Sequence, residues 1–173
     1  MKSLTFWKTV TADTSDFLER ILALLSENSI RHCVIGGQGV NAYADPVVSL
    51  DLDLVVAVDQ LERVEQLLRS AFKVQRCPFS INAESPGSNL RVQIQTDPRY
   101  FDFVERAQPR EVLGLTLPVA DIRDILRGKI WAATDPTRRR SKHLKDLADI
   151  ARILEAEPAL SSDVPPEVLS QVT

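Results

Sequence analysis

Cysteine and histidine are scarce in this sequence, with two of each among 173 residues. Cys33 and Cys77 have apolar or mixed neighbours, and neither belongs to a spaced group of cysteines and histidines of the kind that holds zinc. This scarcity argues against a zinc-binding domain. We expect both cysteines to be free thiols in a reducing compartment.

Long apolar runs and a large excess of charge of either sign are also missing. No window approaches the ~20 apolar residues that a bilayer-spanning helix needs, and residues 1–10 lack the apolar core of a signal peptide. We therefore expect a cytoplasmic protein with no membrane partner. The 21 basic and 24 acidic residues give a net charge of -3. Such a balance provides no general attraction to nucleic acid, so any site for a polyanion has to be local.

The composition that is present, 44% apolar and 26% charged residues, is that of an ordinary soluble globular protein. A chain of this length fits one compact domain. We place that domain at residues 1–157, with a C-terminal helical part at about 120–157. Residues 158–173 are expected to form a tail that either docks as a short helix or frays.

Hydrophobic periodicity predicts both helices and strands in the first half of the chain. Residues 13–28 and 60–72 carry apolar side chains at helical spacing. Residues 50–58 begin with strict alternation and continue as an apolar run, which is typical of a central strand with a polar face at its start. Other strands are predicted at 32–35, 72–76 and 90–96, with a short helix after the glycines that follow the first of them and a loop at 78–89.

The second half is predicted to be mainly helical. Residues 115–119 resemble a short edge strand that contains a proline. Asp121 is a candidate cap for a helix with Ile122, Ile125, Leu126 and Ile130 on its inner face. An arginine-rich loop around Pro136 separates it from a last strong helix at about 141–156.

Two carboxylates stand out in the predicted central strand. Asp51 and Asp53 are two residues apart, so both side chains leave the same face, roughly 7 Å apart along the strand. Neighbouring carboxylates in an apolar strand are costly unless a cation compensates for their charge, and Mg²⁺ is a natural compensator. The alternative is an edge strand with a solvated acidic face.

A glycine turn precedes this strand at Ile35-Gly36-Gly37. Because glycines carry no side chain, backbone N–H groups there can approach a phosphate closely. A phosphate site next to a pair of metal-binding carboxylates could bind the phosphates of a nucleotide together with their metal ion. The combination favours a nucleotide site over the solvated acidic strand.

The hydrophobic residue, Gly-Gly, spacer and Asp-x-Asp together resemble the signature of the polymerase-beta-like nucleotidyltransferase superfamily. Farther along, Lys129, Trp131-Ala132-Ala133, Arg138-Arg139-Arg140 and Lys145-Asp146-x-x-Asp149 look like motifs of AbiEii-type nucleotidyltransferases, a group that includes toxins of toxin–antitoxin systems. The resemblance covers about residues 15–156. It implies an α/β (α+β) nucleotidyltransferase fold, in which a small mixed twisted sheet is flanked by helices and followed by C-terminal helices.

The resemblance also implies an activity and its residues. The activity is transfer of a nucleoside monophosphate from a nucleoside triphosphate (NTP) to a hydroxyl of RNA or protein, and an antitoxin is an implied partner. Asp51 and Asp53 would hold Mg²⁺ or Mn²⁺ and act in catalysis together with Lys129 and Asp146. The implied nucleotide-binding residues are Gly36, Gly37, Ser49, Lys129 and Lys145.

The basic residues of the second half each have a second interpretation. Lys129 falls within the inner stripe of its predicted helix, where an ammonium needs an anion unless it reaches water at the edge of the stripe. Asp146 either forms a surface pair with Lys145 or orients the substrate or a catalytic lysine. The run Arg138-Arg139-Arg140 is either a solvated loop or contributes one or two contacts to phosphate or RNA.

One position departs from the superfamily pattern. A third carboxylate is common on a neighbouring strand, and the corresponding residue is Gln93. An amide is a weaker magnesium ligand and cannot act as a general base at neutral pH. The sequence therefore leaves open a degenerate protein that binds nucleotide or a partner without turnover. A plain RNA-binding module would rest on the arginine run alone.

Overall fold

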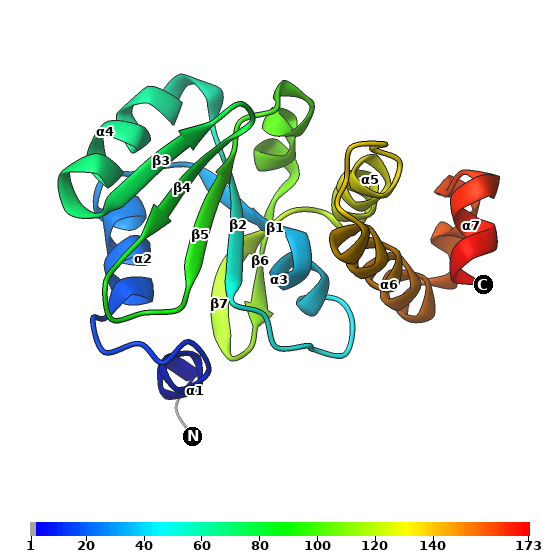
Figure 1. Ribbon diagram of the computed structural model, residues 1–173, viewed down its shortest axis with the longest axis horizontal. Helices are drawn as coiled ribbons and strands as arrows, with labels where there is room; N and C mark the ends of the chain where they lie inside the picture. The colour runs from blue at the N-terminus through cyan, green and yellow to red at the C-terminus, as the bar shows by residue number, and fades with distance from the viewer. Residues whose placement is uncertain (1–2) are drawn as a thin grey trace.

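The computed structural model of the protein describes residues 3–173 (Figure 1). Its centre is a seven-stranded mixed sheet with the strand order β3-β4-β5-β2-β1-β7-β6. In chain order the strands are β1 (His32–Ile35), β2 (Asp51–Val56), β3 (Lys73–Cys77), β4 (Ser80–Glu84), β5 (Arg91–Gln95), β6 (Gln108–Val112) and β7 (Leu115–Val119). Strand β2 runs antiparallel to β1 and parallel to β5, and β1 runs parallel to β7.

Helices flank this sheet. In chain order the α-helices are α1 (Ser3–Val10), α2 (Phe17–Glu27), α3 (Gly36–Asn41), α4 (Leu61–Ala71), α5 (Ile122–Ala133), α6 (Arg140–Ala156) and α7 (Pro166–Val172). Short 3-10 helices are η1 (Val58–Gln60), η2 (Pro98–Arg106) and η3 (Pro158–Asp163). Figure 1 shows α2 and α4 beside the β3–β5 half of the sheet and α5, α6 and α7 at the other end of the molecule. The predicted fold, a mixed sheet flanked by helices with C-terminal helices, is confirmed.

Strand β2 shows how sequence pattern positions the core and the polar face. Its alternating start leaves Asp51 and Asp53 half-buried on one face, while Leu52 and Leu54 are buried on the other. The remainder of β2 is apolar and fully buried because the strand is central and covered on both faces.

Two strand predictions were wrong. Residues 78–89 were expected to be a loop, but Ser80–Glu84 form β4, which pairs with β3 and β5. Residues 115–119 were expected to form an edge strand, but β7 lies between β1 and β6. Pro118 is accommodated in this interior strand opposite Pro109 of β6, and β6 takes the edge.

The two ends of the described chain pack against the body of the molecule. Trp7 of α1 is buried, although the sequence pattern had not indicated a helix there. At the other end, η3 and α7 contact α6 and bury Leu160, Val164 and Val168. Residues 3–173 contain no helix that is both long and apolar enough to span a membrane.

Candidate active site

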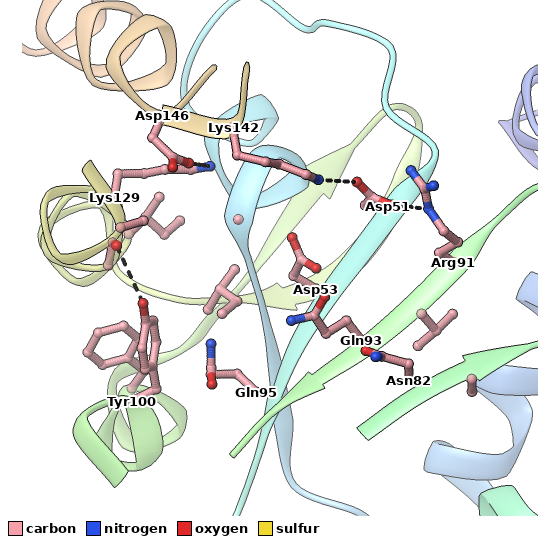
Figure 2. Close-up of a pocket in the computed structure, with 18 of the residues that line it drawn as sticks. Asp51, Asp53, Asn82, Arg91, Gln93, Gln95, Tyr100, Lys129, Lys142 and Asp146 are labelled. Atoms are coloured by element: carbon pink, nitrogen blue, oxygen red, sulfur yellow. Dashed lines mark hydrogen bonds and ion pairs between the residues drawn. The ribbon is translucent and has the colours of Figure 1, made fainter. Parts of the chain in front are cut away.

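A pocket of about 370 Å³ opens between the polar face of the sheet and the C-terminal helices. Strands β2, β4 and β5 form its floor, and α3, η2, α5 and α6 contribute its walls (Figure 2). Of the residues predicted from the sequence, Gly36, Asp51, Asp53, Lys129 and Asp146 all line it. The structure thus brings together residues from both halves of the chain.

The two carboxylates of β2 have different surroundings. Asp51 accepts a hydrogen bond of 2.7 Å from Arg91 Nε of the neighbouring strand, and its other oxygen lies 3.8 Å from Lys142 Nζ. Within the described part of the chain, the Asp53 carboxylate has neither a side-chain hydrogen bond nor an ion pair, and it points into the pocket (Figure 2). Asp53 is therefore the carboxylate that is ready to take a new partner.

The glycine turn makes the space that Asp53 occupies. Gly36 has a φ of +65°, in the left-handed region that residues other than glycine rarely adopt. A Cβ atom on Gly36 would overlap the Asp53 Oδ2 atom. Gly37 does not line the pocket, and a Cβ atom there would lie 4.0 Å from its nearest neighbour, Asp149 Oδ2. The two glycines that are adjacent in the sequence thus differ in their surroundings.

The groups around Asp53 shift the pKa of its carboxyl in opposite directions. Burial raises the pKa of its carboxyl above the ordinary value, Lys129 opposes this rise, and Asp51 adds to it. A cation placed between Asp51 and Asp53 would relieve both the burial penalty and the repulsion between them.

Lys129 is enclosed by two acidic side chains of α6. Its Nζ atom lies 2.8 Å from Asp149 Oδ2 and 3.2 Å from Asp146 Oδ1. Lys129 is only 9% exposed, so it does not reach out to water at the edge of the helix. Burial alone would lower its pKa, but the two carboxylates outweigh that effect and hold the pKa above its ordinary value.

The acidic pair is itself held by arginines. Arg138 Nε donates to Asp146 Oδ2 at 2.9 Å, and Arg152 donates to Asp149 Oδ1 at 2.9 Å. The second terminal guanidinium nitrogen of Arg152, Nη2, donates to Asn41 Oδ1 and to the Asp45 carbonyl, both at 2.7 Å. This network ties α6 to the end of α3, so the position of Lys129 depends on three segments of the chain.

Asp149 was not among the predicted site residues, although it closes the Lys129 site. Its signal in the sequence was the spacing Lys145-Asp146-x-x-Asp149, which places Asp146 and Asp149 on one helix face. The same spacing leaves Lys145 exposed and outside the lining of the pocket. Asp146 pairs with Lys129 and Arg138 rather than with Lys145.

Ser49 also stands outside the pocket lining, immediately before β2. Its hydroxyl oxygen accepts a hydrogen bond of 3.2 Å from the Asp51 backbone N–H, and its carbonyl accepts one from Gln38. Ser49 therefore shapes the approach of the chain to the first carboxylate.

The neighbouring strands present amides to the pocket where a further carboxylate was expected. Gln93 lies directly opposite Asp53 in the parallel β2–β5 pair, and Asn82 lies opposite Gln93 on β4. Residues 3–173 contain no group of three or more histidine, cysteine or acidic side chains arranged to hold a metal ion. Asp97 and Asp102 do not replace the missing acid, because they pair with Arg99 and Arg106 and lie outside the pocket lining.

Comparison with solved structures defines the fold class. The antibiotic-resistance factor ANT(2″)-Ia, in complex with adenylyl-2″-tobramycin, aligns with a TM-score of 0.61 and 14% identity over 90% of this chain and 94% of its own. Lincomycin-bound LnuA, a lincosamide antibiotic adenylyltransferase, gives 0.52 and 14% over 94% and 99%. A nucleotidyltransferase-like protein from Paracoccidioides brasiliensis gives 0.54 and 17% over 91% and 94%. At these identities the likeness establishes a nucleotidyltransferase fold.

The family follows from the sequence itself. Residues 16–171 match the family described as nucleotidyl transferase AbiEii toxin, type IV TA system. Because the match covers most of the chain, this protein belongs to the AbiEii nucleotidyltransferase family. A search among curated proteins found no match.

Proposed function

We propose that this protein transfers a nucleoside monophosphate from an NTP to a hydroxyl of RNA or of a protein in the cytoplasm. The observation that carries the proposal is the Asp53 carboxylate, which has no ion pair among residues 3–173 and faces a pocket beside Gly36 and next to a second carboxylate. Membership of the AbiEii family supports nucleotidyl transfer. The family description also supports a toxin role with an antitoxin partner, which we include in the proposal.

The residues present fit a divalent cation of the magnesium type. Magnesium is commonly bound by one or two carboxylates together with substrate phosphates, so Asp51 and Asp53 suffice without a third acid. Burial and the neighbouring Asp51 raise the pKa of Asp53 even though lysines lie nearby, so a cation bound between the two carboxylates would favour the charged form of Asp53. Mg²⁺ or Mn²⁺ held by these two residues would neutralise phosphate charge and align the reacting groups.

The chain's own cations would hold the phosphates. Lys129, Lys142 and Arg91 all line the pocket around the two carboxylates. Lys129 is kept charged and in place by Asp146 and Asp149, which makes it a fixed positive charge rather than a mobile one. The Gly36 backbone lies in the pocket lining and would contact a phosphate there, while Gly37, Ser49 and Lys145 lie outside the lining and would act at the margin of the site. Positioning and charge neutralisation suffice for phosphoryl transfer without a protein nucleophile.

A second candidate is a protein of the same fold that binds nucleotide or a partner without turnover. Gln93 favours it, because the residue opposite Asp53 cannot take a proton from an acceptor hydroxyl at neutral pH. The ion pairs of Asp51 with Arg91 and Lys142 also satisfy part of its charge without a metal.

A label-transfer assay distinguishes the two candidates. The protein is incubated with labelled NTPs, Mg²⁺ and total cellular RNA and protein. The enzyme predicts transfer of label to a macromolecule, and Asp53→Asn should abolish the transfer. Asp102→Asn is the matched control, because its exposed carboxylate lies outside the pocket lining and should be dispensable. Nucleotide binding without transfer by the wild type would establish the binder, and transfer that survives Asp53→Asn would contradict the proposed site.

A further inference from the structure

Asn41, the last residue of α3, lies outside the pocket lining but is bonded toward both of its sides. Figure 2 shows Lys129 and Asp51 on opposite sides of the pocket, with Asp53 between them. These two side chains come from helix α5 and strand β2, which are far apart in the sequence. Their relative position therefore depends on contacts that link the C-terminal helices to the segment before β2.

The side-chain amide of Asn41 uses its whole hydrogen-bonding capacity. Its Nδ2 atom donates to Gln38 Oε1 and to the Val47 carbonyl, both at 2.8 Å. Its Oδ1 atom accepts from the Val47 backbone N–H at 2.9 Å and from Arg152 Nη2 at 2.7 Å. The backbone partners fix the orientation of the amide, because a backbone N–H only donates and a carbonyl only accepts. Val47 and Val48 are 54% and 59% exposed, so the amide rather than apolar burial fastens this loop.

On one side, these bonds lead to the first carboxylate. Strand β1 pairs with β2 only at Asp53–Val56, so Asp51 lies beyond the end of β1. Hydrogen bonds from α3 take the place of a neighbouring strand there. Gln38 Nε2 donates to the Ser49 carbonyl at 3.3 Å, and the Ser49 hydroxyl accepts from the Asp51 backbone N–H at 3.2 Å. Gln38 is fully buried, so this support is internal to the protein.

On the other side, the bonds lead to the buried lysine. Arg152 Nη2 is shared between Asn41 Oδ1 and the Asp45 carbonyl, and Arg152 Nη1 donates to Asp149 Oδ1 at 2.9 Å. The second oxygen of Asp149 lies 2.8 Å from Lys129 Nζ. An uninterrupted series of polar contacts thus runs from the Asp51 backbone through Asn41 to the Lys129 ammonium.

We propose that Asn41 is a positioning residue that sets the place of the Asp51 carboxylate relative to the Lys129 ammonium. This inference rests on the proposed function, in which Asp51 holds the metal ion and Lys129 holds the phosphates. Both must be aligned for an in-line displacement, and a misplacement of about 1 Å can cost roughly 100-fold in rate. Asn41 acts through Val47, Gln38 and Arg152.

Two measurements that need no NTP test the inference. Electron paramagnetic resonance gives the affinity of the Asp51–Asp53 site for Mn²⁺, and mass spectrometry after treatment with an amine acylating reagent gives the accessibility of Lys129. Asn41→Ala should lower the Mn²⁺ affinity about tenfold and speed the acylation of Lys129 about tenfold, because both sides lose a shared support.

Two further variants break one side at a time. Arg152→Met removes the link to Asp149, so acylation of Lys129 should speed up while Mn²⁺ affinity stays within about twofold. Gln38→Met removes the bond to Ser49 and should have the opposite pair of effects. These variants test the two links even if Asn41→Ala folds poorly. Identical effects of Arg152→Met and Gln38→Met on the two measurements would contradict a two-sided role for Asn41.

Asp13→Ala is the matched control. Asp13 is 8% exposed, as Asn41 is, and its carboxylate accepts hydrogen bonds from Ser15 and Phe17 at the start of α2, outside the pocket lining. It should lower stability to urea without changing either measurement. Mn²⁺ affinity and Lys129 acylation that Asn41→Ala leaves unchanged, or alters no more than Asp13→Ala does, would overturn the role of Asn41. Failure of the wild type to bind Mn²⁺ would instead overturn the metal site of the proposed function, and the inference with it.

Discussion

Replacing Gly36 by alanine tests the link between the glycine turn and the carboxylate site. The residue has a φ of +65°, and a left-handed conformation costs an alanine about 1–2 kcal/mol. The new methyl group would also overlap Asp53 Oδ2, and relieving such overpacking costs about 1–3 kcal/mol. We expect Gly36→Ala to lower the free energy of unfolding by roughly 2–5 kcal/mol and to displace the Asp53 carboxylate.

Gly37→Ala is the control for this experiment. Its Cβ atom would meet nothing closer than 4.0 Å, and alanine is favoured over glycine inside a helix. We expect its stability to change by less than about 1 kcal/mol.

Urea unfolding measures the stability of both variants, and electron paramagnetic resonance of Mn²⁺ measures occupancy of the Asp51–Asp53 site. Gly36→Ala should weaken Mn²⁺ binding about tenfold or more, because about 1.4 kcal/mol of lost ligand geometry has that effect. Equal effects of the two substitutions on stability and on Mn²⁺ binding would refute the reasoning.

Three other residues give independent predictions. Lys129→Met leaves two buried carboxylates without their shared cation, and we expect a loss of about 3–5 kcal/mol in the free energy of unfolding in urea. Gln93→Asp adds a third carboxylate directly opposite Asp53, and Mn²⁺ affinity should rise roughly tenfold in a resonance titration. Burial raises the pKa of the Cys33 thiol to about 12, so at pH 8 it stays protonated and should react with a thiol reagent far more slowly than the part-exposed Cys77.

Each of these predictions has a control. Lys142→Met removes a half-exposed lysine 3.8 Å from its nearest carboxylate oxygen and should cost less than about 1 kcal/mol, so equal losses would contradict the Lys129 prediction. Unchanged Mn²⁺ affinity in Gln93→Asp would show that the opposite strand does not face the metal. Cys77→Ser should remove the fast-reacting thiol, and a fast phase that persists would show that Cys33 is accessible.

Strand β2, which carries the two carboxylates, and the glycine turn before it were predictable because local sequence pattern determines them. Alternation fixes which face of β2 carries Asp51 and Asp53, and the strand ladder then places Gln93 opposite Asp53, as the sequence indicated. The sequence left two surroundings open for Lys129, because a lysine within an apolar stripe needs either an anion or water. The structure supplies the anions as Asp146 and Asp149.

Other features depend on contacts that no local pattern reveals. Strand β4 has the sequence Ser-Ile-Asn-Ala-Glu, which has low strand propensity, and it forms because β3 and β5 pair with both of its sides. The interior position of β7 depends on a partner strand whose proline faces its own. The direction of the Gln95 amide is set by the Asp97 N–H, and the anchoring of Asp149 by Arg152, so neither could be inferred from residue type.

The anchoring of Lys129 by α6 also determines when the pocket comes into existence. During synthesis the carboxylate strand and its glycine turn leave the ribosome well before Asp146 and Asp149, the counterions that allow a lysine to be buried. A nascent chain therefore has the two carboxylates of β2 without a fixed Lys129. The complete pocket forms only when the last long helix docks, because Lys142 and Asp146 of α6 belong to its lining, so the proposed nucleotide binding should appear only at the end of folding.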